Sequence, residues 1–196
     1  MFLRRFAAGL ALLCMTLTAY SDEIQENYTV DSRGNVVFAY VVENLPLTKQ
    51  EIFNAAHSYL LNAYKETKYN ITEKEPEKGT VCGSGSYVGV YENNSVTSGK
   101  IFDADFQLRV SAQDSRARVQ IIVRNYKMVT VRDFGSNSRE EVLISSMAPI
   151  ADNKDQHKVF KKAFVNLQER AQKTINLMTE ALKSTQPSSD SDDSNW

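Results

Sequence analysis

The segment GTVCGSGSY, from Gly79 to Tyr87, gathers residue types that could carry chemistry: three glycines, two serines and a cysteine. Glycine-rich loops can hold phosphates, and a cysteine can act as a nucleophile. A phosphate loop of the Gly-x4-Gly-Lys-Ser/Thr type needs a lysine that reaches the phosphate, and no lysine follows Gly83. A dinucleotide loop needs a strand before it and a helix after it, whereas β-type sequence flanks this segment on both sides. We therefore predict a strand whose small side chains let a helix or another backbone approach closely.

Cys82 is the candidate nucleophile of this segment, and it would need a general base nearby. The chain has two histidines, His57 and His157. The first falls on the flank of a predicted helix, and the second lies among lysines in the first turns of another. Cys82 is therefore interpreted as a core thiol, because burial is the commoner fate of a free cysteine.

Two carboxylates, Asp103 and Asp105, share one face of a predicted strand. Arg109 follows them on the same face, which favours a solvated, ion-paired surface over a metal site. The sequence contains no His-x3-His or Cys-x2-Cys spacing, so we expect neither a metal nor a cofactor. The protein is predicted not to be an enzyme. A hydrolase or other enzyme that uses Cys82 or this carboxylate pair is the alternative.

Four arginines are the candidate binding residues: Arg109, Arg118, Arg124 and Arg132. Together with Lys127 they could line the exposed face of a sheet and form a concave basic patch. Such a patch could hold a small anionic ligand or a partner protein. The alternative is that these side chains are solvated and paired with nearby aspartates.

The elements that would position these residues alternate between strand and helix patterns. VVFAYVV, at Val36–Val42, is β-branched and aromatic, which is typical of a buried strand. Thr48 and Glu51 form a capping box, and the apolar residues after it indicate a helix of about four turns. Further segments are predicted as strands at 68–74, 79–87, 101–112 and 117–134, a polar loop at 91–100, a short edge strand at 140–146 and a second helix from about 152 to 183. This order predicts an α+β fold, a curved antiparallel sheet with two helices packed on one face.

The two ends of the chain differ from the middle. Residues 1–21 combine a basic start, an apolar run too short to span a bilayer, and small residues before a cleavage site expected after Ser21. This layout is typical of a secretory signal peptide, so we expect export to the periplasm or another part of the cell envelope. An uncleaved anchor is one alternative. A lipid anchor at Cys14 is another, although Leu13 stands where a lipidated cysteine needs a small residue.

One α+β domain is expected over residues 22–184, followed by a disordered tail at 185–196. No transmembrane segment is expected after cleavage. Without the leader's Arg4 and Arg5, and without the three aspartates of the tail, 21 basic residues face 21 acidic ones. This balance argues against binding to nucleic acid or to an anionic membrane. Cys82 is then the one remaining cysteine, so an intramolecular disulfide is excluded.

The stretch Leu45–Tyr87 combines a Leu-Thr-Lys-Gln-Glu-Ile-Phe helix start, an aromatic helix, a charged hairpin and a glycine-spaced strand. It resembles a bacterial family of exported proteins known as a domain of unknown function with a TBP-like fold. The likeness covers about Val36–Tyr126. It implies a curved antiparallel sheet with helices on its back, and it implies no activity, because a fold does not carry a function.

The resemblance and the missing catalytic constellation together predict a non-catalytic binding module, with another envelope protein or a small anionic ligand as its partner. A structural envelope component that uses the long second helix as its interface remains open.

Overall fold

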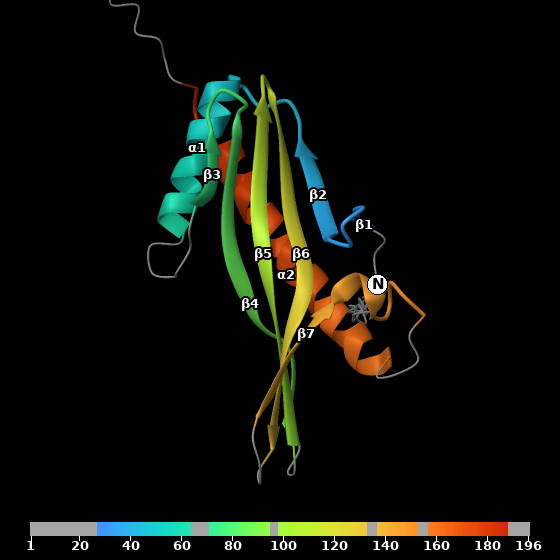
Figure 1. Ribbon diagram of the computed structural model, residues 1–196. Coiled ribbons are helices and arrows are strands. Elements are labelled where there is room, and N and C mark those ends of the chain that lie inside the picture. The colour runs from blue at the N-terminus through green and yellow to red at the C-terminus, as the bar shows by residue number, and fades with distance from the viewer. Residues whose placement is uncertain (1–26, 64–70, 95–97, 133–136, 153–156, 188–196) are drawn as a thin grey trace, which may run out of the picture.

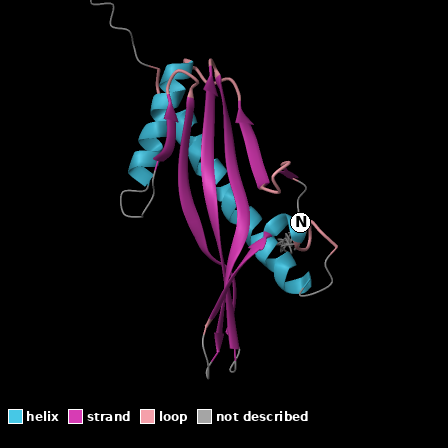
Figure 2. Cartoon of the chain, in the orientation of Figure 1, coloured by secondary structure: helices cyan, strands magenta, loops and turns pink. Residues whose placement is uncertain are grey.

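The computed structural model describes residues 27–63, 71–94, 98–132, 137–152 and 157–187. Its elements, in chain order, are β1 (Tyr28–Val30), β2 (Val36–Val42), α1 (Lys49–Ala63), β3 (Ile71–Glu75), β4 (Thr80–Asn94), β5 (Ser98–Gln113), β6 (Arg116–Arg132), β7 (Ser138–Leu143), a 3-10 turn (Ile144–Ser146) and α2 (His157–Ser184). The expected α+β fold with two helices is confirmed (Figure 2). The predicted signal peptide and most of the predicted tail lie outside the described residues.

The strands form one antiparallel sheet in the order β1-β2-β6-β5-β4-β3, and β7 pairs with the far end of β6. Both helices lie behind this sheet in Figure 1, with α2 crossing it diagonally and α1 beside the β3 edge. The lower ends of β4, β5 and β6 continue with β7 as a narrow twisted ribbon. No helix in the described ranges combines the length and apolar character that a membrane span requires.

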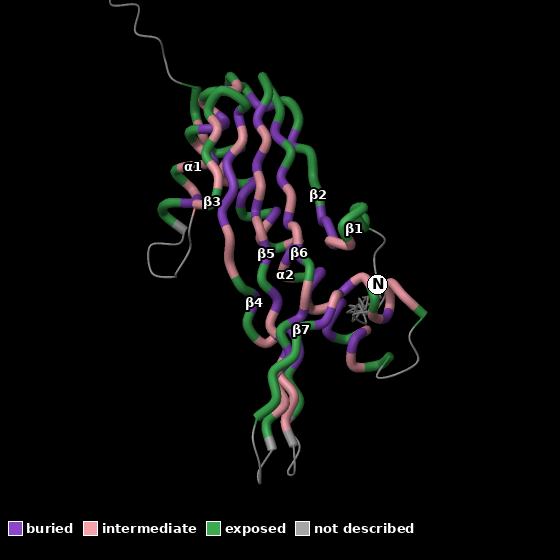
Figure 3. The backbone as a smooth tube through the Cα atoms, viewed as in Figure 1, coloured by how far each residue is buried: buried purple, intermediate pink, exposed green. Residues whose placement is uncertain are grey.

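The core fills the space between the sheet and α2. Residues of β5 and β6 alternate between buried and more exposed positions (Figure 3), as expected for strands with one covered face. The helix contributes an apolar stripe of buried residues: Phe160, Ala163, Phe164, Leu167, Ala171, Ile175, Met178 and Leu182. Phe164 is fully buried, and its ring centroid lies 5.0 Å from that of Tyr28 and 6.2 Å from that of Phe38. The apolar stripe predicted from the sequence is therefore the face of α2 that packs against the sheet.

The start of α1 follows the predicted capping box. The Thr48 amide donates to Glu51 Oε2 at 2.8 Å, and the Glu51 amide donates to Thr48 Oγ1 at 3.3 Å. Leu47 and Ile52, which flank the cap, are both buried, as a hydrophobic staple requires. These contacts fix where the helix begins and how it meets the sheet.

The glycine-rich segment lies in β4, as predicted, and its small side chains allow α1 to approach. A Cβ atom at Gly83 would lie 3.1 Å from Leu60 Cδ2 of α1, closer than an ordinary van der Waals contact. The phosphate-loop interpretation of this segment needs a loop leading into a helix, and the structure shows a continuous strand instead.

The polar loop predicted at 91–100 is wrong in its extent. Strand β4 continues to Asn94 and β5 begins at Ser98, with Tyr91 opposite Phe102 and Asn94 opposite Gly99. These residues belong to the ribbon that extends beyond α2 (Figure 1), where both faces of the strands can carry polar side chains. Alternation with apolar residues therefore disappears although the strands continue.

A bulge in β4 at residues 88–90 is held by side chains from both sides of the sheet. Gly89 has a φ of 63°, a conformation that favours glycine, and its amide donates to Asp103 Oδ1 at 2.7 Å. From α2, Arg170 donates to the carbonyls of Val88 and Gly89, and Asn166 Nδ2 donates to the Val90 carbonyl at 2.9 Å. The bulge thus fixes the position of α2 on the sheet.

Tyr126 is buried on the helix-covered face of β6, and its hydroxyl has no hydrogen-bond partner among the described residues. Burial raises the pKa of this phenol far above its ordinary value. We expect Tyr126→Phe to leave the free energy of unfolding unchanged or to raise it by up to about 2 kcal/mol, because the change removes a buried polar group that nothing satisfies. Urea unfolding measured by circular dichroism tests this expectation, and a clear loss of stability would contradict it.

Candidate functional site

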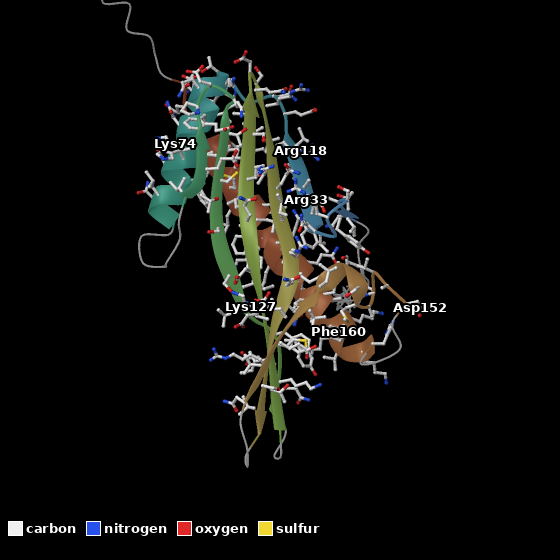
Figure 4. The ribbon with its side chains drawn as sticks, viewed as in Figure 1. Arg33, Lys74, Arg118, Lys127, Asp152 and Phe160 are labelled. Carbon is white, nitrogen blue, oxygen red and sulfur yellow. The ribbon has the colours of Figure 1, made fainter. Side chains whose placement is uncertain are left out.

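The face of the sheet opposite the helices carries the candidate binding residues, and we call it the open face. In Figure 1 neither helix crosses this face. Register places Arg109 of β5 opposite Cys82 of β4 and Gln120 of β6, and it places Arg118 of β6 opposite Val41 of β2. Figure 4 labels Arg118 on the upper part of this face and Lys127 well below it.

Arg109 takes part in a polar row across three strands. Its Nε donates to Cys82 Sγ at 3.3 Å, and its Nη2 lies 3.5 Å from Glu73 Oε2 of β3. The Cys82 thiol in turn donates to the same Glu73 oxygen at 3.3 Å. The predicted pairing of Arg109 with the neighbouring aspartates is therefore replaced by pairing with Glu73. Glu73 comes from a strand 36 residues earlier in the chain, and nothing in the local sequence indicates that it would meet Arg109.

Cys82 is fully buried, as predicted, but it lies beneath Arg109 on the open face rather than under a helix. Burial raises the pKa of its thiol above the ordinary value, and the hydrogen bond from Arg109 opposes this shift without cancelling it. His57 belongs to α1 on the other face, where its ring stacks on Phe53. Burial, followed by the charge of Lys74, lowers the pKa of His57. His57 is therefore not placed to serve Cys82 as a base, and the acceptor of the thiol hydrogen bond is Glu73, which also pairs with Arg109.

This environment predicts a slow thiol. In a Cys14→Ser background we expect Cys82 to react with Ellman's reagent at least about 100-fold more slowly in the folded protein than in denaturant, because the thiol is buried and protonated. Arg109→Ala should speed the reaction, since it uncovers the sulfur. Rapid labelling of the folded protein, with its stability unchanged, would contradict this prediction.

Arg118 and Arg124 differ from Arg109, because each is exposed and has no ion-pair or hydrogen-bond partner among the described residues. They lie six positions apart on β6, about 20 Å at the rise of an antiparallel strand. Between them on the same face are Gln120 and Ile122, and register places Ala39 of β2 beside Gln120. Within the described part of β6, these two arginines are therefore exposed cations without an ion-pair partner.

Arg132 does not join this group. It is the last residue of β6, opposite Ser98, and its side chain lies outside the described part of the chain. Between Ala104 and Phe106 of β5 the register shifts, so that Arg124 and Asn125 together oppose one residue. This bulge changes the alternation, and position 132 then follows the series that begins at buried Tyr126. Read as one uninterrupted strand, the segment puts Arg118, Arg124 and Arg132 on the same face, because their positions differ by even numbers.

The two candidate catalytic carboxylates are both engaged in structural contacts. Asp103 accepts the hydrogen bond from the Gly89 amide, and Asp105 forms an ion pair with Lys127. The hydrogen bond that Lys127 donates to Asp105 raises the pKa of the Lys127 ammonium. No cluster of three or more histidine, cysteine, aspartate or glutamate side chains with the geometry of a metal site occurs within the described ranges. Both carboxylates of the alternative enzyme site are thus occupied by contacts within the fold.

Comparison with known proteins agrees with the fold. Residues 38–127 match the family model "Domain of unknown function (DUF4468) with TBP-like fold". The chain is similar to the crystal structure of a TBP-like protein from Parabacteroides distasonis, with a TM-score of 0.59 and 16% sequence identity over 80% of this chain and 97% of that one. It also matches a DUF4468 family protein from Bacteroides ovatus, with a TM-score of 0.49 and 12% identity over 80% of this chain and 92% of that one. No curated protein matches the sequence. The predicted resemblance and the TBP-like fold are thus confirmed.

Proposed function

We propose that this chain, whose residues 38–127 match the DUF4468 family of unknown function, is an exported, non-catalytic binding module of the bacterial cell envelope. Its partner is an anionic group presented by another envelope protein, and the open face of the sheet holds it. The proposal of export rests on the signal-peptide pattern of residues 1–21.

One observation carries the binding proposal: among the described residues, Arg118 and Arg124 are exposed and have no ion-pair partner, whereas Arg109 and Lys127 on the same face are paired. Arg109 is matched by Glu73, and Lys127 is matched by Asp105. A guanidinium group without a partner is well suited to bind a carboxylate or phosphate, because it can donate two parallel hydrogen bonds to either group. The thiol and the aspartates that an enzyme would use are instead buried or bonded within the fold.

Site-specific photocrosslinking in the native envelope tests this function. A photoreactive residue at Gln120 lies between the two arginines on the open face, and one at Leu177, which is 45% exposed on α2, serves as the control position. We expect a discrete adduct from position 120 that disappears in the Arg118→Gln/Arg124→Gln double variant. An adduct from position 177 alone would instead favour the structural component that uses its long helix as an interface.

Export is tested separately. Cell fractionation with sequencing of the mature N-terminus should find the protein in the envelope fraction, beginning close to residue 22. A protein that stays in the cytoplasm with its first residues intact would overturn the localisation while leaving the binding face to be judged by the crosslinking.

A further inference from the structure

The outer edge of β2 is uncovered over its second half. Strand β1 pairs with β2 at Val36–Phe38, and no described strand pairs with the outer edge from Ala39 to Val42. Figure 1 shows β1 at the foot of β2, and no other described strand or helix lies beside the upper part of β2. An uncovered edge of this kind presents a row of backbone donors and acceptors that can accept another strand.

The hydrogen-bonding pattern fixes which backbone groups face outward. The Asp31 amide donates to the Asn35 carbonyl at 2.9 Å, and bonded pairs in an antiparallel ladder recur at every second residue. Counting in steps of two from Asn35, the residues of β2 whose backbone amide and carbonyl groups point away from β6 are Val37, Ala39 and Val41. The amide and carbonyl of Val41 therefore point outward, beyond the last residue that β1 covers.

This edge lacks the features that usually protect one. VVFAYVV contains no lysine, no other charge and no proline, and the ladder with β6 runs through it without a bulge. Tyr40 is 47% exposed and Val41 is 45% exposed, on opposite faces of the strand. An added strand would thus find apolar side chains to pack against on both faces.

The charge beside this edge indicates which strand would fit. Arg118 lies directly opposite Val41 on the open face and has no ion-pair partner among the described residues. A strand added outside β2 would lie two strand spacings from β6, roughly 10 Å away. The Arg118 guanidinium can extend over the Val41 side chain and meet a carboxylate from the added strand across that distance. The aliphatic parts of both side chains would then pack on Val41, which favours this pairing.

We propose that the edge of β2 from Ala39 to Val42 accepts an extended acidic segment of a partner protein as an additional strand, with Arg118 paired to one of its carboxylates. This inference rests on the proposed function, which it deepens by naming the partner as a polypeptide and the contact as main-chain pairing. Backbone bonds supply affinity in this mode of recognition, and the side-chain charge supplies selectivity.

Fluorescence anisotropy with a defined probe tests the proposal. The probe is a labelled peptide of alternating glutamate and valine, eight residues long, and its matched control carries N-methyl groups on alternate amides. We expect the peptide to bind the wild-type protein, the N-methylated control to bind at least tenfold more weakly, and Arg118→Gln to weaken binding at least fivefold. Val41→Pro removes an amide that faces outward, a place where an edge strand tolerates proline, and it should weaken binding at least tenfold.

Amide hydrogen exchange supplies a second measurement on the unchanged protein, so the test survives if Val41→Pro does not fold. The Val41 amide should exchange quickly alone and slowly with the peptide. Protection before the peptide is added, or concentration-dependent dimers that disappear in Val41→Pro, would overturn the inference, because another segment or a second copy then holds the edge.

The results also separate the two proposals. Suppose that the N-methylated peptide binds as tightly as the unmodified one, that Val41→Pro binds the peptide as tightly as the wild-type protein, and that Arg118→Gln loses affinity. The anion-binding face then stands and strand addition is overturned. If Val41→Pro loses binding while Arg118→Gln does not, the edge accepts a strand without charge recognition, and the anionic partner is overturned. Absence of any binding to the peptide overturns the inference of strand addition and leaves the crosslinking result to decide the function.

Discussion

Phe164→Ala is expected to lower the free energy of unfolding by about 3–5 kcal/mol, the usual cost of deleting a buried phenylalanine ring. The ring is fully buried between α2 and the sheet, and it packs against Tyr28 and Phe38 from the first two strands. Its removal would leave a cavity where β1, β2 and α2 meet, so the docking of the helix should weaken. Urea unfolding followed by circular dichroism measures the loss.

Leu177→Ala is the matched control for this variant, because Leu177 lies on the same helix and is 45% exposed. It should change stability by no more than about 0.5 kcal/mol, as most surface substitutions do. If the two variants were equally stable, the burial of the α2 stripe against the sheet would be contradicted.

Gly83→Val is expected to destabilise the protein by about 1–3 kcal/mol, the typical cost of forcing extra atoms into a packed contact. A Cβ at this position would already lie 3.1 Å from Leu60 Cδ2, and the two valine methyl groups would extend further toward α1. Valine is otherwise well suited to a strand, so a loss of stability reports the approach of the helix and not the propensity of the residue. Thermal or urea unfolding gives the size of the effect.

Ser86→Val provides the comparison for this variant, because Ser86 is exposed on the open face of the same strand. It should be neutral or slightly stabilising. A Gly83→Val protein as stable as Ser86→Val would mean that α1 does not pack closely on β4, and the explanation given for the glycine-rich segment would fail.

The open face and the free edge of β2 together describe how the domain could recognise a partner without catalysis. Arg109 is held by Glu73 and Cys82, so it shapes the surface, whereas Arg118 and Arg124 remain available. The buried thiol beneath Arg109 contacts both Arg109 and Glu73. Of Arg118 and Arg124, Arg118 is the one that lies opposite the uncovered part of β2, at Val41.

The sequence alone determined the main elements of the fold, because their causes are local. The capping box at Thr48 and Glu51 fixes the start of α1 through two hydrogen bonds within one turn. The apolar stripe of α2 and the alternation in β5 follow from the side-chain periods of helix and strand. These periods put apolar residues on one face whatever surface that face packs against. Glycine at position 83 likewise indicated a close approach, although the sequence did not say which helix would come near.

The tertiary structure decided which charged residues are available, because pairing depends on strands that are distant in the chain. Glu73 meets Arg109 across β4, which the local sequence cannot show. The bulge at Arg124 changes the alternation of β6 and separates position 132 from Arg118, and a bulge of this kind leaves no clear mark in the order of residues. Among the described residues, the edge of β2 from Ala39 to Val42 is uncovered because β1 is three residues long while β2 is seven. The lengths of both strands together decide this, so neither segment alone predicts it.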